Sequence, residues 1–457
     1  NIKDLTMAIQ YGSQITFGMW ELQELLDPTH DLVKLAGVVD WEEIHNQIVP
    51  YYSTIGRQGL SIRLMVGLHI LKHKENMSDE KCADRIRSDL YWMYFCGVES
   101  DSLKSKYQHL NSATMTKFRN RIGNAGFAEI EKIIIKYLIQ KNHIDTRTMN
   151  TDSTCQPKNI IYPTDTGLLD KGRKLVIRSM KKLVDMGIKP VSGVRTYARK
   201  SRKIILNIMK LGQDRQERIQ AGTLELARQA RHVLGKCGEM ILKTERKIKT
   251  MTGDIKKKTM KVLLDMKNKS KLLKKVIAQS RQRYQGKHVE KKIYSLTEPQ
   301  VVVIRKGKSH CPNEYGSKLN ISTDVNGFIV NHENYSSSIH DSKLLEPALK
   351  AWEQNTGVLP DQVNTDRGYR QKGTTGGRIQ QVIRICTPTS GKKKNPNAEK
   401  YWFKKGQKQR SQIEGVIGHL KQDHRLNKCR YTGSVGDRIN ASLASLAWNL
   451  TKLSTRI

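Results

Sequence analysis

A long basic stretch, almost without proline, restricts the fold of this chain more than any other feature. Residues 171–290 contain 34 Lys/Arg and 9 Asp/Glu, an excess of 25 positive charges within a chain of net charge +38. No proline follows Pro190 in this stretch, and Leu, Ile, Val and Met recur at intervals of three and four over 224–234 and 258–276. This spacing is typical of amphipathic helices. We therefore predict a helical insertion at 171–290, with two or more long helices packed as a hairpin.

The net charge indicates the kind of partner. A charge of +38 on 457 residues attracts polyanions strongly. Nucleic acid is the first candidate and an anionic membrane surface the second. No run approaches 18 apolar residues, and no basic region precedes an apolar stretch as in a secretory signal, so we expect no membrane association. A solvated helical face without a ligand is the usual explanation for a charge run, but the excess here is of one sign and favours contact with the DNA backbone.

The first 140 residues have the pattern of short helices. Asp40 and Ser78 are candidate N-caps, residues 60–74 form an apolar helix, and Gly97 is a candidate stop for the helix that begins at Ser78. Another helix opens at Ser112. A basic helix after several short ones is compatible with a helix-turn-helix-like DNA module, although any small helical domain shows this pattern. We predict a helical N-terminal domain, 1–140, for DNA binding or dimerisation, with three candidate DNA contacts in its last helix: Lys117, Arg119 and Arg121.

Strand patterns begin after residue 141. Residues 324–327 (Asp-Val-Asn-Gly) give a strong hairpin signal between two of the strands, and a helix is expected over 340–351. A basic loop from Gly391 then leads to a final helix. We predict a mixed α/β (α+β) catalytic core built from 141–170 and 291–457. The expected strands cover 146–152, 318–323, 328–334, 362–366 and 381–387.

Three acids occupy chemically related places in this order of elements. Asp152 closes the first strand, Asp366 closes the fourth, and Glu414 lies on the final helix. Carboxylates are natural Mg²⁺ ligands, and two such ions about 4 Å apart can hold the attacking and leaving oxygens of a phosphodiester. A single Asp at a strand end is more often a turn residue. Three acids in this order are less expected by chance, so we predict a metal site.

Two cations accompany the last of these acids. Arg410, Glu414 and Lys421 are spaced by 4 and 7, which places all three on one face of a helix. The spacing alone fits an ordinary i,i+4 salt bridge. Next to a metal site, the same cations are expected to contact phosphate.

Other candidate ligands are weaker. His69 and His73 stand four apart, but they lie in an apolar helix and are expected to pack rather than bind metal. The seven cysteines are scattered without a C-x-x-C pair, as in a protein with buried, reduced thiols.

Taken together, these motifs resemble the DDE transposases of bacterial insertion sequences, in the broad group of families four and five. The resemblance covers nearly the whole chain and implies an RNase H-like core with a helical N-terminal domain. The basic insertion falls between the first two core strands, so its DNA role is not taken over from relatives with insertions elsewhere. It rests on Asp152-Ser-Thr, Tyr162-Pro-Thr-Asp165-Thr-Gly-Leu-Leu, Lys306-Gly-Lys-Ser-His310, Tyr315-Gly-Ser-Lys318, Asp341, Asp366-Arg-Gly-Tyr369 and Arg410-x3-Glu414-Gly-Val-Ile-Gly-His-Leu-Lys421, with two N-terminal segments, Leu64-Met-Val-Gly-Leu and Tyr91-Trp-Met-Tyr-Phe-Cys96.

The resemblance also implies site residues. Asp152, Asp366 and Glu414 correspond to the catalytic and metal-binding triad, which holds two Mg²⁺ per active site, with Mn²⁺ as a substitute. Arg410 and Lys421 match the cations of the family's Tyr-Arg-Glu-Lys signature. Its tyrosine position is occupied by Gln407 here, so a base-flipping step linked to that signature is in doubt, and Trp402 or Tyr401 would have to replace the tyrosine. The further expected DNA contacts are Lys306, Lys308, Arg367 and Trp402.

The implied activity is cleavage of DNA at the element ends and joining of the freed 3′-hydroxyls to target DNA. The expected partners are double-stranded terminal inverted repeats, target DNA and a second copy of the chain, in the bacterial cytoplasm at the nucleoid. A DNA-binding protein without catalysis and a metal-dependent nuclease without strand transfer remain alternatives. For the secondary acids Asp165 and Asp341, the alternatives are a place behind the metal ligands and a role as helix cap or turn residue, and the second is favoured. For His310 and His419, the alternatives are phosphate contact and a packing or surface role, and again the second is favoured.

Overall fold

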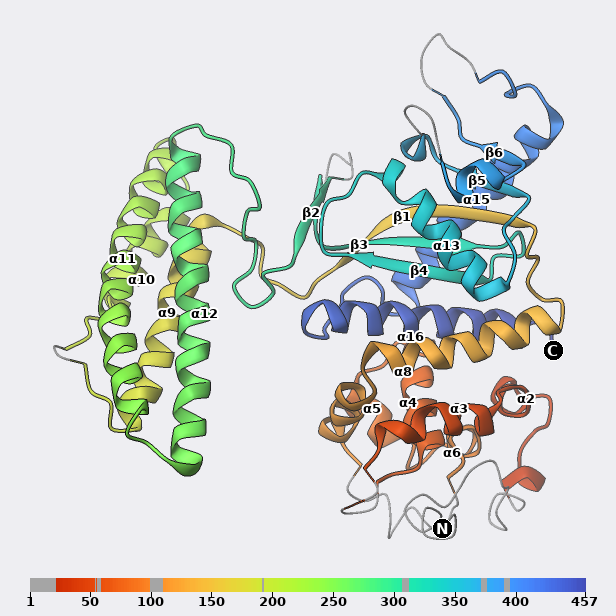
Figure 1. Cartoon of the computed structure of the whole chain (residues 1–457), viewed down its shortest axis with the longest axis horizontal. Coiled ribbons are helices and arrows are strands. Elements are labelled where there is room, and N and C mark those ends of the chain that lie inside the picture. Colours follow the sequence, from red (N-terminus) through yellow and green to blue (C-terminus); the bar gives the residue numbers. More distant parts are fainter. Residues whose placement is uncertain are drawn as a thin grey trace. The chain divides into compact units, whose positions relative to one another are not determined.

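The strands that the structure describes form one six-stranded mixed sheet (Figure 1). Of the three predicted acids, Asp152 lies on this sheet and Asp366 directly follows one of its strands. The strand order is β2-β3-β1-β5-β6, and β4 pairs with β3. β1 is antiparallel to β3 but parallel to β5, and β5 is parallel to β6. The hairpin predicted at 324–327 joins β3 to β4, with Gly327 at φ +80°. The strands are β1 (Thr148–Pro157), β2 (Val302–Arg305), β3 (Asn313–Thr323), β4 (Ile329–Tyr335), β5 (Gln362–Thr365) and β6 (Arg384–Cys386).

The computed structural model describes residues 22–53, 55, 59–98, 110–190, 193–305, 312–370, 376–389 and 395–457. The chain divides into two units, one formed by Asn1–Asn159 and Ile304–Ile457 and the other by Ile160–Val303. The second unit is wider than the insertion predicted at 171–290. Its first helix begins earlier, at Asp165, and Ile293 and Leu296 after its last helix are buried in its core.

Helices cover both faces of the sheet. Val416 and Leu420 of α15 (Tyr401–Gln422) pack with Leu319 and Ile321 of β3 on one face. On the other face, α13 (Leu345–Thr356) buries Trp352 in a core that also contains Val363 of β5. This mixed sheet with flanking helices is the RNase H-like core. Short elements complete the region: the 3-10 helices η2 (Asp341–Lys343) and η3 (Arg367–Tyr369), and α14 (Arg378–Gln381).

The N-terminal helices share their core with the sheet instead of forming a separate domain. Helix α16 (Gly433–Ser454) lies beside α8 (Ser112–Gln140), and its Leu443, Leu446 and Leu450 belong to the same buried cluster as the N-terminal helices (Figure 1). The predicted domain 1–140 is therefore part of the same unit as the core. Its other helices are α2 (Asp31–Val38), α3 (Trp41–Ile48), η1 (Val49–Tyr51), α4 (Ile62–Lys74), α5 (Asp79–Arg85) and α6 (Leu90–Cys96).

The predicted capping residues explain several helix boundaries. Asp40 accepts a hydrogen bond from Glu43 N at the start of α3, and Ser78 accepts one from Lys81 N at the start of α5. Gly97 ends α6 in the left-handed conformation at φ +65°. The single helix expected from Ser78 to this glycine is instead two helices, because Asp89 caps a new helix by accepting from Trp92 N.

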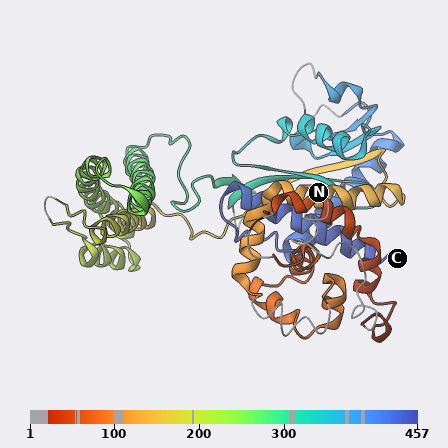
Figure 2. The ribbon, with the colours of Figure 1, turned by 60° about the horizontal axis from the view of Figure 1, so that its bottom comes forward.

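The described residues of the basic insertion form four helices with a core of their own, and Figure 2 shows these helices as a bundle. The long helices α11 and α12 follow one another across a short connection, and α9 packs against both. This confirms the prediction of a helical insertion with long paired helices. The four helices are α9 (Asp165–Asp185), α10 (Ala198–Met209), α11 (Arg215–Ile248) and α12 (Gly253–Tyr284). None of the helices that the structure describes is long and apolar enough to cross a membrane.

Candidate active site

Asp152 lies within β1, not at its end as the sequence pattern predicted. β1 continues to Pro157 because its second half still pairs with β3. The parallel pairing of β1 with β5, however, stops at Thr151 and Thr365. Asp152 and Asp366 directly follow the last paired residues of β1 and β5, so the end of the parallel ladder brings the two aspartates together. Asp152 is paired with Ile321, whose side chain packs under α15, and it therefore points to the α15 face.

The two aspartates repel each other. Burial raises the pKa of Asp152 to about 6, and the charge of Asp366 adds to the rise. The charge of Asp341 acts in the same direction, whereas the Ser153 backbone amide and Arg410 oppose it. Asp366 is held at the start of η3, where its Oδ1 accepts from Gly368 N at 2.8 Å. The nearby carboxylates therefore outweigh the nearby positive charge of Arg410 in their effect on Asp152.

Asp341 joins this group, although the sequence favoured a turn or capping role. It is the first residue of η2, and its Oδ1 accepts from Ser153 Oγ at 2.6 Å and pairs with Lys318 Nζ at 2.7 Å. A Cβ added at Gly368 would lie 3.1 Å from Asp341 Oδ2 and 3.1 Å from Asp366 Oδ1, so both carboxylates lie next to this glycine. Ser153 and Lys318 belong to the Asp152-Ser-Thr and Tyr315-Gly-Ser-Lys318 motifs, but the sequence alone assigned them no role.

The buried side of the site is a polar network. Tyr369 is 1% exposed, and its hydroxyl donates to Asn320 Oδ1. Burial, with the charge of Asp152, raises the pKa of Tyr369 well above its usual value, so the phenol keeps its proton. Asn364 Nδ2 donates to Asn150 Oδ1 at 2.8 Å, which joins β5 to β1 just before the two aspartates. These contacts fix the two strands in register at the site.

Helix α15 brings Arg410 and Glu414 to the site. The two form an i,i+4 ion pair, as the spacing predicted. Burial opposes it, but the hydrogen bond to Glu414 and the charges of Asp152 and Asp366 raise the pKa of Arg410, so its guanidinium lies among all three predicted acids. The Glu414 side chain is 63% exposed and its carboxylate is turned to Arg410.

The approach of α15 to the sheet depends on two neighbouring residues. A Cβ added at Gly406 would lie 2.4 Å from Asn364 Oδ1 and 2.6 Å from Cys386 Sγ. Only glycine allows the helix to come so close to β5 and β6. Gln407, at the position of the family tyrosine, donates from Nε2 to the Cys386 carbonyl at 2.8 Å. It therefore anchors α15 to β6.

The remaining predicted DNA contacts of the core are placed differently. Lys421 does not lie beside Glu414 but pairs with Glu314 at 3.7 Å. Trp402 is half-buried, with the Arg384 guanidinium 5.6 Å from its ring centroid. Arg367 is exposed and follows Asp366 directly. Lys306, Lys308 and His310 lie outside the described residues.

The three cations predicted on the N-terminal helix do not act alike. Lys117 and Arg121 are exposed on α8, and Arg121 lies over the Tyr52 ring at 4.5 Å. Arg119 is only 6% exposed and donates to both carboxylate oxygens of Asp79. The prediction of a surface contact at Arg119 is therefore wrong, because a buried ion pair holds its guanidinium inside the domain.

Several other candidates are structural. Asp165, in the first turn of α9, pairs with Arg283 Nη1 at 2.8 Å and with Lys292 at 3.7 Å, inside the insertion. His69 and His73 are fully buried, and burial, together with nearby cations, lowers the pKa of both, so they pack as neutral rings.

His419 and the cysteines also have structural roles. His419 stacks on Trp448 and pairs with Asp423, in agreement with a surface role. Within the described ranges, the six cysteines are buried and free, as predicted.

The donor set suits a divalent cation in part. Asp152, Asp366 and Asp341 concentrate negative charge in a half-buried site, which is the chemistry that hard cations require. In the part of the chain that the structure describes, no three His, Cys, Asp or Glu side chains converge closely enough to hold a metal ion. The pairing of Glu414 with Arg410 explains why the third acid does not complete the group.

Comparisons with known proteins agree with this arrangement. The model of a transposase domain (DUF772) matches residues 20–121, and the model of a transposase DDE domain matches residues 371–454. The second match contains Arg410, Glu414 and Lys421. A protein of Rhizobium meliloti named "Uncharacterized protein ORF8 in nfe locus" is 36% identical over 167 residues, which are 35% of this chain and 78% of that protein. No solved structure matches the chain. The chain belongs to the DDE transposases of insertion sequences.

Proposed function

We propose that this transposase cleaves DNA at the ends of its insertion sequence and joins the freed 3′-hydroxyls to target DNA. One observation carries the proposal: Asp152 and Asp366 meet where the parallel ladder of β1 and β5 ends, with Arg410 of α15 beside them. Carboxylates beside a guanidinium on a rigid sheet and helix suit phosphoryl transfer, because one part of the site can hold cations and the other can hold a phosphate.

Each of the site residues has a distinct part in the proposed reaction. Asp152 and Asp366 would hold Mg²⁺ or Mn²⁺. Glu414 would break its ion pair with Arg410 and become the third carboxylate ligand. The guanidinium of Arg410, once released, would bind the phosphate to be cleaved. Asp341 keeps Ser153 and Lys318 in place beside Asp152.

Divalent ions bound to these carboxylates would lower the pKa of the attacking hydroxyl and offset the charge that develops on the phosphate. The side chains themselves supply positioning and electrostatics. Since burial raises the pKa of Asp152 to about 6, a cation has to displace a proton from this carboxyl below that pH, and we expect cation binding to weaken there.

The test uses the full chain and duplex DNA that carries the terminal inverted repeats flanking its gene. With Mg²⁺ or Mn²⁺ we expect nicks at the element ends and products joined to a target plasmid. Asp366→Asn should reduce both reactions by roughly 10³-fold or more, since loss of a metal ligand removes several kcal/mol of transition-state stabilisation. Asp361→Asn, an exposed acid just before β5, is the matched control and should keep full activity. Absence of nicking and joining by the wild-type protein would refute the proposal.

One observation favours the alternative of DNA binding without catalysis: the Glu414 carboxylate is already paired with Arg410. If the ion pair between Glu414 and Arg410 persists in the complex with DNA, the wild-type protein should bind the element ends without cleaving them. Glu414→Gln should then bind these ends as the wild type does. Cleavage without joined products would indicate a nuclease instead.

A further inference from the structure

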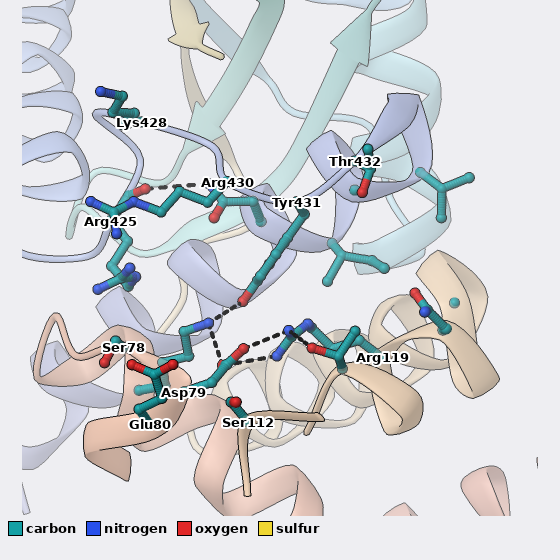
Figure 3. A pocket seen from close by; sticks show the side chains of 18 residues that line it. Ser78, Asp79, Glu80, Ser112, Arg119, Arg425, Lys428, Arg430, Tyr431 and Thr432 are labelled. Atoms are coloured by element: carbon teal, nitrogen blue, oxygen red, sulfur yellow. Dashed lines mark hydrogen bonds and ion pairs between the residues drawn. The ribbon is translucent and has the colours of Figure 1, made fainter. Parts of the chain in front are cut away.

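A pocket of about 600 Å³ lies between the N-terminal helices and the segment that joins α15 to α16, and its lining contains none of the active-site acids Asp152, Asp366 and Glu414. Its walls come from α4, α5 and α8 on one side and from residues 425–440 on the other (Figure 3). Five cationic side chains line it against two carboxylates, Asp79 and Glu80. The volume is within the usual range for ligand pockets, but the lining is mostly polar and basic.

The floor of the pocket is a buried cluster in which two cations share one carboxylate. Lys72 is 3% exposed, and its Nζ contacts Asp79 Oδ1 at 2.6 Å and Tyr431 Oη at 2.9 Å. Arg119 holds both oxygens of the same Asp79 and lies over the Tyr431 ring at 4.5 Å. Burial and the charges of Arg119 and Arg425 together lower the pKa of Lys72 to about 8, although the charge of Asp79 opposes this shift. The floor therefore carries positive charge that the protein itself does not balance.

Three more cations stand at the rim. Figure 3 shows Arg425, Lys428 and Arg430 on the side of the pocket across from Asp79 and Glu80. Among the described residues, no carboxylate forms an ion pair with any of these three side chains. Within the described part of the chain, the Arg425 guanidinium donates to one group, Asn76 Oδ1 at 3.3 Å, and the backbone of Arg425 is in the left-handed region at φ +64°. Lys428 and Arg430 are exposed.

Neutral donors complete the wall. Thr432 is the N-cap of the 22-residue helix α16 and makes no capping hydrogen bond through its side chain. Val435 and Gly436 of its first turn also line the pocket, so the positive end of the helix lies at this wall. Ser112, at the start of α8, adds a hydroxyl on the opposite wall. Cations, hydroxyls and a helix N-terminus are the groups that proteins use for phosphate.

The occupant follows from charge. Two carboxylates already lie in the pocket, and the chain as a whole has 81 Lys/Arg against 43 Asp/Glu, so an acidic segment of a second copy is a poor match. A DNA strand supplies a phosphate at every nucleotide, and its contacts with proteins go largely to phosphate oxygens.

We propose that this pocket is a DNA-backbone site, in which Arg425, Lys428 and Arg430 bind successive phosphates of one strand above the cluster of Lys72, Asp79 and Arg119. The site rests on the proposed function for its ligand, but it positions DNA and takes no part in the chemistry. The role predicted for Arg119 is thereby changed: its charge supports the floor, and the phosphate contacts come from the segment before α16.

The first test compares two double variants of the full chain. K428Q/R430Q removes two exposed rim cations, and K136Q/K141Q removes two exposed lysines elsewhere on the same unit. Binding of a fluorescein-labelled 30-base-pair duplex is measured against salt. Loss of two phosphate contacts should lower the log–log salt slope by about 2 and weaken binding roughly tenfold or more at 0.1 M salt. K136Q/K141Q should change both far less. Equal effects of the two variants would overturn the proposal.

The second test needs no variant. Lysines of the wild-type protein are acetylated with and without the duplex and mapped by mass spectrometry. DNA should protect Lys428 and leave Lys136 unchanged. Unaltered labelling of Lys428 would refute the site, and equal protection by polyglutamate at the same charge concentration would overturn its assignment to DNA.

The outcomes separate this site from the proposed reaction. Asp366→Asn should bind the duplex like the wild type, because the pocket is intact. If the wild type neither nicks nor joins DNA but K428Q/R430Q still loses affinity, the proposed function fails and the site stands. If catalysis is normal and K428Q/R430Q binds like the wild type, the site fails alone.

Discussion

Replacement of Asp152 by asparagine should stabilise the protein while it removes a metal ligand. The pKa of Asp152 rises from 3.8 to about 6 on folding, first through burial and then through the charges of Asp366 and Asp341. A raised pKa means that the protonated carboxyl stabilises the fold, and that this contribution is lost as the pH rises from about 4 through about 6. Asparagine is neutral throughout. It can still accept the Ser153 N–H bond, which measures 2.7 Å in the wild type.

The size of the effect follows from the shift. About two pKa units correspond to an upper bound of about 3 kcal/mol, and solvent screening at this half-buried position reduces it to about 2 kcal/mol. For a unit of this size the melting temperature should rise by about 4 °C at pH 8. At pH 4 the difference should shrink to a small part of its value at pH 8, because Asp152 is then protonated in the folded chain and the pH is close to its unfolded pKa of 3.8.

The assay is thermal unfolding of wild type, Asp152→Asn and the exposed control Asp361→Asn, between pH 4 and pH 8. Millimolar Mn²⁺ should raise the melting temperature of the wild type and of the control at pH 8, but should do so much less for Asp152→Asn. A variant that melts at or below the wild type at pH 8, or an equal response to Mn²⁺, would refute the reasoning.

Two further predictions concern how the site is held. Gly406→Ala should destabilise the protein by about 1–3 kcal/mol, because its Cβ would collide with Asn364 and Cys386 and push α15 away from β5; activity should fall with it, whereas Gly415→Ala, in open space on the same helix, should change little. Lys158→Met should cost about 3–5 kcal/mol in chemical denaturation, because it leaves Asp437 buried without its partner at 2.6 Å. The double variant K158M/D437L should recover most of that loss, and failure to recover would show that packing, not charge, dominates there.

The sequence revealed the elements better than their pairing. Hairpin residues at 324–327, caps at Asp40 and Ser78, and the helical spacing of the insertion are local signals, and each marks an element of the structure, although the helix that begins after Ser78 ends earlier than predicted. Register is set by pairing between distant strands, so the sequence placed Asp152 at a strand end. In the structure β1 continues, and only the parallel ladder ends there.

Burial was the other information that the sequence withheld. In the sequence, Arg119 is a basic residue like its exposed neighbours Lys117 and Arg121. It is buried because α8 packs against α5, where Asp79 pairs with its guanidinium. Helix α16 was not predicted, although Leu443, Leu446 and Leu450 repeat at helical spacing. Asp341 was underrated for a similar reason: its partners, Ser153 and Lys318, are 188 and about 20 residues away in the chain.

The contact between Asp165 and Arg283 has a consequence for how the protein folds. β1 must pair with β3, but the 144 residues from Ile160 to Val303 separate them. Closing so long a loop from a disordered chain costs about 2 kcal/mol more than closing ten residues, and it slows folding. Because Asp165 begins α9 and Arg283 nearly ends α12, their ion pair brings the two ends of the insertion together once its own core has formed. A folded insertion then acts as a short connection, so we expect the insertion to fold first and the strands that carry the active-site acids to pair afterwards.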